Sequence, residues 1–124
     1  MSTARKAAVV VGALRIAYGG ALALLPARTT GRWLGSDGER AGAQVAIRAL
    51  GAREIALHTG VLVTALAGTA VRPWFAASVA GDLSDIAATL VARRRLPEGS
   101  APAAAAVGGA SAAISVAVAA GLDA

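Results

Sequence analysis

Four long apolar stretches dominate this sequence and limit what it can fold into. They cover residues 7–25, 43–67, 74–92 and 103–122. An α-helix rises about 1.5 Å per residue, so each stretch matches a hydrocarbon core roughly 30 Å thick. A helix in water needs a polar face, and the last stretch offers only Ser111 and Ser115. We therefore expect an all-α protein, an antiparallel up-down bundle of four transmembrane helices, in the cell membrane as a multi-pass protein.

The composition excludes several other classes of protein. Hydrophobic residues make up 56% of the chain and charged residues 15%, whereas a disordered chain combines low hydrophobicity with high net charge. The sequence has no cysteine, which excludes a disulfide-stabilised module, thiol catalysis and thiolate metal ligands. The length of 124 residues allows one domain, so we expect residues 1–124 to form a single membrane domain.

The segments between the apolar stretches carry signals for helix ends. A polar connection over residues 27–42 separates the first two stretches. Within it, Ser36 and Glu39 have capping-box spacing, which places the start of the second helix near Asp37. Pro73 suits the first turn of the third helix. Because the connections are short, consecutive helices are expected to be antiparallel neighbours.

The distribution of positive charge between the connections predicts a topology. The first and third connections hold six lysines or arginines, and the N-terminal segment with the second connection holds three. Cytoplasmic loops are enriched in Lys and Arg, so both chain termini are expected outside. Arg5 and Lys6 could begin a signal peptide, but Arg15 interrupts the apolar run that follows. We therefore expect the first helix to be retained.

Ionisable residues inside the apolar stretches are the main anomaly of the sequence. There are seven of them: Arg15, Arg48, Arg53, Glu54, His58, Asp82 and Asp85. A charge at the centre of a membrane costs about 2.5 to 3.5 kcal/mol on insertion scales, so these side chains are expected to pair. Three arginines balance three carboxylates when the histidine is neutral. The set predicts a paired network that faces the interior of the bundle.

The positions of these residues along the helices predict which side chains meet. Four lie near the middle of an apolar stretch, so an antiparallel arrangement brings them to one level. This central layer consists of Arg15, Arg53, Glu54 and Asp82. Three further residues are displaced toward one membrane side and are expected beside the layer: Tyr18, Arg48 and Asp85. Residues three apart share a helix face, as Asp82 and Asp85 do.

The predicted cluster suggests a pocket that binds or converts a lipophilic small molecule. Two neighbouring carboxylates repel each other when both are charged, so their pKa values move apart. One can then act as an acid and the other as a base. The candidates for catalysis are Asp82, Asp85, Glu54, His58 and Tyr18, and those for substrate binding or charge pairing are Arg15, Arg48 and Arg53. Such acid–base chemistry suits epoxide opening, cyclisation or isomerisation. The sequence contains no nucleophile motif, and His58 has a second interpretation as a hydrogen-bonded interior residue, so catalysis stays an open question.

Two other functions compete with this hypothesis. In a non-catalytic structural or accessory subunit, the same charges would only fix which helices pair and in what register. In a proton or ion pathway, chains of Asp, Glu and His carry the proton, and four short helices would need to form an oligomer to do so. Metal binding by the carboxylates and the histidine is disfavoured, because three nearby arginines would repel a cation.

The excess of positive charge points to lipid rather than to nucleic acid. The formal net charge is +5, and much of it lies in the connections, above all at Arg93, Arg94 and Arg95. There it can meet anionic lipid headgroups. Glycine pairs lie inside apolar stretches and form no phosphate-binding loop. We expect the lipid bilayer and a lipophilic small molecule as partners, and no nucleic acid, metal ion or cofactor.

The last apolar stretch contains no charged residue, but its small residues form a pattern. They repeat every four positions, at Gly109, Ala113, Ala117 and Gly121. Such a stripe lets helix backbones approach closely. We expect this helix to pack on the others through the stripe and so close the bundle. A homo-oligomer that forms through the same stripe is the alternative.

Two sequence motifs carry a resemblance to a family. Residues 48–54 have the pattern Arg-x-x-Gly-x-Arg-Glu, and residues 81–85 have the pattern Gly-Asp-x-x-Asp. Together with the Arg-Pro-Trp of residues 72–74, they make most of the chain resemble small uncharacterised integral membrane proteins common in actinobacteria. In that family a helix with the first pattern precedes a helix with the second. The resemblance implies a four-helix membrane protein and implies no activity or substrate.

Overall fold

The computed structural model describes residues 1–122 and confirms that the protein is all-α. Four long helices are α1 (Thr3–Leu24), α4 (Ala41–Ala67), α5 (Arg72–Ala92) and α6 (Ser100–Ala120). Two short helices, α2 (Pro26–Thr29) and α3 (Gly31–Leu34), follow α1, and two 3-10 helices, η1 (Gly35–Glu39) and η2 (Arg93–Arg95), complete the elements. No strand occurs among the described residues. Pro73 lies in the first turn of α5, as predicted.

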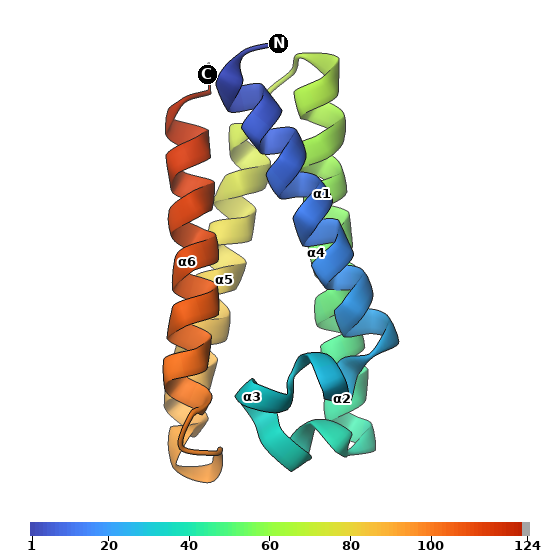
Figure 1. Cartoon of the computed structure of the whole chain (residues 1–124), viewed down its shortest axis with the longest axis vertical. Helices are drawn as coiled ribbons and strands as arrows, with labels where there is room; N and C mark the ends of the chain where they lie inside the picture. The colour runs from blue at the N-terminus through green and yellow to red at the C-terminus, as the bar shows by residue number, and fades with distance from the viewer. Residues whose placement is uncertain (123–124) are drawn as a thin grey trace.

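The long helices form two pairs. Figure 1 shows that successive long helices run in opposite directions, with both ends of the chain at one end of the molecule and α2 and α3 at the other. Most contacts between helices lie within the α1–α4 pair and within the α5–α6 pair, and far fewer join one pair to the other. The two pairs therefore lie side by side without packing closely along their full length.

Glycines allow α1 and α4 to pack closely. A Cβ atom added to Gly19 would lie 2.7 Å from the carbonyl oxygen of Gly51, a distance that real Cβ atoms do not adopt. Gly12 makes a looser contact with α4, because its Cβ atom would lie 3.3 Å from the carbonyl oxygen of His58. The absence of side chains at these positions brings the two backbones together. This pair is thus a rigid platform for the charged residues of α4.

The connection between α1 and α4 differs from the polar loop expected there. It folds into α2, α3 and η1, and Ser36 lies within η1. The predicted capping box is wrong, because α4 begins after Arg40 and no side chain caps its N-terminus. Tertiary contacts hold the segment instead: the carbonyl group of Trp33 accepts a hydrogen bond from Ser100 at the start of α6. These contacts fix α3 against the α5–α6 pair.

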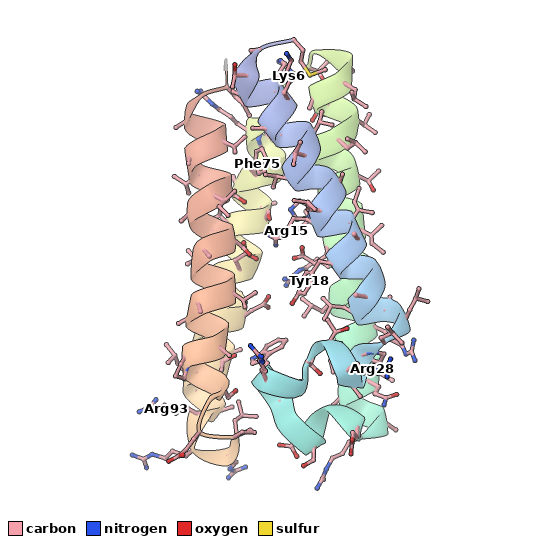
Figure 2. The ribbon with its side chains drawn as sticks, viewed as in Figure 1. Lys6, Arg15, Tyr18, Arg28, Phe75 and Arg93 are labelled. Atoms are coloured by element: carbon pink, nitrogen blue, oxygen red, sulfur yellow. The ribbon has the colours of Figure 1, made fainter. Side chains whose placement is uncertain are left out.

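An apolar cluster joins the two pairs at the end where the chain termini lie. Phe75 of α5 is its largest fully buried side chain. The other buried members are Ala8, Val61, Ala65, Val71 and Leu122. Arg5 and Arg72 close this end, because their guanidinium groups donate to backbone carbonyl groups near the helix ends. Figure 2 places Phe75 in this region, well away from the end that carries Arg93.

The outward faces of the long helices are strongly apolar. Leu14, Val45 and Val91 are among many large hydrophobic side chains left exposed. Four helices are long and apolar enough to cross a membrane: Thr3–Leu24, Ala41–Ala67, Arg72–Arg95 and Ser100–Ala120. Each overlaps one of the apolar stretches seen in the sequence. Contact of this much apolar surface with water would be unfavourable, whereas contact with lipid chains would not.

Helix α6 packs through only part of the stripe of small residues expected to close the bundle, since a Cβ atom on Gly121 would lie 3.2 Å from the side chain of Ala4 on α1. Gly109 and Ala113 face away from the other helices, and a Cβ atom on Gly109 would meet nothing within 4 Å. The buried residues of α6 are instead Ser100, Ala112 and Ser115. Gly108, beside the predicted stripe, allows the close approach: its Cβ atom would lie 2.9 Å from the side chain of Ile86 on α5. The stripe thus contacts α1 at its C-terminal end, whereas a neighbouring face of α6 makes the close contact with α5.

Candidate functional site

Arg15 of α1 is the centre of the charged cluster. Its Nε and one terminal nitrogen donate to the two carboxylate oxygens of Glu54 on α4, at 2.8 and 2.9 Å. The two terminal nitrogens also donate to the carboxylate of Asp82 on α5, at 2.7 and 3.2 Å. A single guanidinium group thus holds two carboxylates from two different helices. Such fork-shaped pairs are the strongest class of charge-assisted hydrogen bond.

These three residues are buried and connect three helices. The side chains of Arg15, Glu54 and Asp82 are 11%, 3% and 6% exposed. The helices that carry them belong to different pairs, and α1 makes few other close approaches to α5. The ion pairs are therefore the main link between the two helix pairs at the middle of the molecule. Figure 2 shows Arg15 about halfway along the long helices.

A second ion pair lies next to the first. Arg53 of α4 contacts the carboxylate of Asp85 on α5, with nitrogen–oxygen distances of 3.0 and 3.5 Å. It also approaches a carboxylate oxygen of Glu54 at 3.6 Å, which links the two ion pairs. Its guanidinium group lies over Gly81, where a Cβ atom would be 3.1 Å from it. The glycine of the Gly-Asp-x-x-Asp motif makes room for the arginine.

His58 lies behind the cluster and is fully buried. Its Nδ1 is 2.8 Å from the carbonyl oxygen of Glu54, and its Nε2 is 2.9 Å from the hydroxyl group of Ser78 on α5. A carbonyl oxygen only accepts, so Nδ1 carries a proton, and in the neutral ring Nε2 accepts from Ser78. This arrangement matches the interpretation of His58 as a hydrogen-bonded interior residue.

Arg48 does not join the cluster, contrary to expectation. It is exposed and donates to the carbonyl group of Ala23 near the end of α1. Five residues separate Arg48 from Arg53, which turns the two side chains about 140° apart on a helix. Without Arg48 the cluster contains two arginines and three carboxylates, so its formal charge is 2 − 3 = −1 with His58 neutral.

A pocket opens beside the cluster, between α1, α4, α5, α6 and the α2–α3 segment. Its volume is about 480 Å³, within the range of roughly 300 to 1,000 Å³ that is typical of ligand sites. Its polar end is lined by Arg15, Tyr18, Glu54, Asp82 and Asp85, and its apolar wall by Trp33, Leu50, Ala103, Ala104, Ala106 and Val107. His58 does not line it. The pocket therefore pairs an apolar chamber with a charged end.

The groups that line the pocket differ in how free they are. Both oxygens of Glu54 and both oxygens of Asp82 accept from Arg15, whereas the side chain of Asp85 is 30% exposed. The hydroxyl group of Tyr18 has no hydrogen-bond partner within residues 1–122, and Figure 2 shows this residue close to Arg15 along α1. At the charged end that Arg15 occupies, Asp85 and Tyr18 are thus the groups most available to a ligand.

Several residues of this region were missed by the sequence analysis. Trp33 lines the pocket, and its indole nitrogen donates to the hydroxyl group of Thr89 on α5 at 2.8 Å. Ser78, Asp82, Asp85 and Thr89 form one polar stripe on α5. Their spacing of four, three and four residues is that of one helix face, so a search for polar residues at that period would have found Ser78 and Thr89.

No metal-binding group is apparent in residues 1–122. No set of three or more His, Asp or Glu side chains in that range is placed to hold a metal ion. Arginine nitrogens lie between the carboxylates instead. Comparisons of the chain with protein-family models, with curated proteins and with solved structures find no match.

Proposed function

We propose that this chain is a multi-pass integral membrane protein that binds and converts a lipophilic small molecule in the pocket beside the charged cluster. The membrane location is supported by the four long apolar helices and by the large hydrophobic side chains on their outer faces. The loop charges support a topology with both termini outside. The resemblance to small actinobacterial membrane proteins agrees with this location and adds no substrate.

The observation that carries the proposed function is the position of the pocket. An apolar chamber of about 480 Å³ ends on Asp85, Tyr18 and the arginine-held carboxylates. Ligand sites combine mostly apolar walls with a few convergent polar groups in this way. A lipophilic molecule would lie along the wall formed by α6, with an oxygen atom or a double bond at the charged end.

The available groups suit proton transfer. In this mechanism Asp85 donates a proton to the substrate and Arg53 stabilises the carboxylate that remains. An isomerisation returns a proton to Asp85 from another atom of the substrate, so no cofactor or second substrate is consumed. Tyr18 donates a hydrogen bond to a substrate oxygen. Glu54 and Asp82 are positioning residues, because Arg15 occupies their oxygens.

A purely structural role for the charges is the second candidate. The observation that favours it is the bridge that Arg15 makes between the two helix pairs, beside the Arg53–Asp85 ion pair and the His58–Ser78 hydrogen bond. In that case the cluster would fix how the pairs dock, and the pocket would be an accidental space. The pocket-blocking experiment below separates the two candidates.

The binding test uses a photoreactive long-chain alcohol and the purified full chain in nonionic micelles. Ala104→Trp fills the pocket from α6, and Ala105→Trp adds the same bulk to the next residue, which is exposed and does not line the pocket. We expect labelling of pocket peptides in the wild type, a loss of at least tenfold in Ala104→Trp, and no loss in Ala105→Trp. Equal labelling of all three proteins would refute the pocket as a binding site and leave the structural role.

The catalytic test uses Asp85→Asn, which keeps the shape of the side chain and removes its acid. Purified wild type and variant are incubated in D₂O with vesicles made from a total lipid extract of the host membrane. Mass spectrometry of the extracted lipids then detects any species that gains carbon-bound deuterium or disappears. We expect such a species with the wild type and none with the variant. A wild type that changes no lipid would refute catalysis on membrane lipids while leaving binding intact.

A further inference from the structure

Two arginines line the pocket at the end away from the carboxylates. Arg28 of α2 and Arg32 of α3 are four residues apart, both exposed, and both belong to the pocket lining. Neither makes a side-chain hydrogen bond or an ion pair with any of residues 1–122. Arg5 and Arg72, by contrast, donate to backbone carbonyl groups. The pocket therefore has two guanidinium groups without partners at its opening.

The pocket is electrostatically polarised along its length. Its inner end carries a formal charge of 2 − 3 = −1, and the two arginines at the other end carry +2. Between the two ends lie apolar residues of α6 and the ring of Trp33. An anionic group would be repelled from the inner end and attracted to the outer one. This orders an amphiphile in one direction only, with its headgroup at the arginines and its chain toward the carboxylates.

We propose that the pocket takes a single-chain lipid whose phosphate or diphosphate headgroup is bound by Arg28 and Arg32. This rests on the proposed function and names the substrate class of the same pocket. A phosphate monoester carries a charge of about −1.5 to −2 at neutral pH, whereas a carboxylate carries −1. The charge of two arginines is therefore balanced better by a phosphate than by a carboxylate. Guanidinium groups also bind phosphate oxygens in a forked geometry.

The position of the α2–α3 segment agrees with a headgroup site. Figure 1 shows the segment at the same end of the molecule as the connection between α5 and α6. That connection carries Arg93, Arg94 and Arg95, the residues expected to meet anionic headgroups at the membrane surface. A lipid with its phosphate at Arg28 and Arg32 keeps its headgroup at the surface. Its chain then runs inward, toward Tyr18 and Asp85 at the level of the buried cluster.

The test compares three probes with one chain length: dodecyl phosphate, dodecanoate and dodecanol. Binding to the purified full chain is measured by titration in nonionic micelles, at low and high salt. Arg28→Gln combined with Arg32→Gln removes both charges. Arg40→Gln is the matched control, because Arg40 lies in the same connection, is exposed and does not line the pocket. Circular dichroism checks that each variant keeps its helices.

We expect dodecyl phosphate to bind more tightly than the other two probes to the wild type. The two arginines are exposed, so the double variant should weaken dodecyl phosphate binding by roughly 10- to 100-fold, which corresponds to about 1.4 to 2.8 kcal/mol in total. Dodecanol binding and the Arg40→Gln protein should be unchanged. High salt should reduce phosphate binding in the wild type, because the two arginines are exposed.

The outcomes distinguish this inference from the proposed function. If Ala104→Trp abolishes binding of every probe but the double arginine variant binds dodecyl phosphate normally, the headgroup site is wrong and the pocket stands. If Ala104→Trp binds every probe like the wild type, the pocket itself is wrong. Binding of phosphatidic acid and of farnesyl phosphate is then compared, because the first carries its phosphate on a two-chain membrane lipid and the second on a single chain. If diacyl phosphatidic acid bound as tightly as farnesyl phosphate, the proposal of a single-chain substrate would be wrong, and the ligand would be a bulk membrane lipid.

Discussion

Replacing Arg15 with methionine is the sharpest test of the cluster, because one side chain holds two carboxylates. The substitution removes four nitrogen–oxygen contacts of 2.7 to 3.2 Å and leaves the side chains of Glu54 and Asp82 buried. The formal charge of the cluster changes from −1 to 1 − 3 = −2. Asp82→Asn has the opposite effect on charge, since it brings the cluster to 2 − 2 = 0 while keeping an acceptor for the arginine.

The expected magnitudes follow from burial and charge. Breaking a buried ion pair by removing one partner costs about 3 to 5 kcal/mol, because the other charge stays buried without compensation. Arg15→Met should therefore lower the free energy of unfolding by that amount or more. Asp82→Asn weakens charged hydrogen bonds and should cost no more than about 1.5 to 3 kcal/mol. Arg48→Met, on an exposed arginine outside the cluster, should cost less than about 1 kcal/mol.

Equilibrium unfolding in mixed micelles, followed by circular dichroism as the fraction of SDS rises, measures these differences. The predicted order of destabilisation is Arg15→Met, then Asp82→Asn, then Arg48→Met. An Arg15→Met protein as stable as the wild type would refute the view that this residue links the helix pairs. If Asp82→Asn were as damaging as Arg15→Met, the assignment of excess negative charge to the cluster would be wrong.

Three further predictions concern the packing and topology of the bundle. Gly51→Ala should destabilise the protein by at least about 1 kcal/mol in the same unfolding assay, because the added methyl group meets the backbone of α1, whereas Gly42→Ala has open space and should be neutral or stabilising. Trp33→Phe removes the indole hydrogen bond to α5 and should lower the free energy of unfolding by about 0.5 to 1.5 kcal/mol. The smaller ring should also widen the pocket, which would be measured as faster release of dodecanol. The chain has no cysteine, so single Ser2→Cys and Ser36→Cys proteins report topology without background labelling. In intact cells an impermeant maleimide should label the cysteine at position 2 and not the one at position 36. The reverse pattern would show that the proposed orientation is inverted.

The sequence predicted the helices and the level of the cluster well because both depend on distance along the chain. Apolar length defines the four long helices, and a fixed rise per residue places Arg15, Glu54 and Asp82 at a common level. Rotation about the helix axis was harder to predict. Helix α4 is apolar on several faces, so no polar face indicated that Arg48 would turn away from the interior. The same ambiguity hid the face of α6 that packs on α5 through Gly108.

The segment between α1 and α4 could not be predicted from local signals. Ser36 and Glu39 have capping-box spacing, but the chain there follows contacts that lie far away in sequence. Trp33 is held by Thr89 and Ser100, which belong to the other helix pair. Local propensity yields to such tertiary contacts in short segments. The pocket depends on this segment for one of its walls, so it was equally hidden from the sequence.

The division of the long helices into two pairs has a mechanical consequence. The contacts that hold the pairs together lie at three levels: the apolar cluster around Phe75, the polar contacts of Arg15, Arg53 and His58 with α5, and the α3 segment held by Thr89 and Ser100. The first is apolar and lies at one end, whereas the other two consist of hydrogen bonds and ion pairs. Release of these polar contacts would let the pairs rotate about the apolar end as rigid bodies, with each long helix intact. Such a rotation would open a sideways passage between the pairs, from the lipid layer to Asp85.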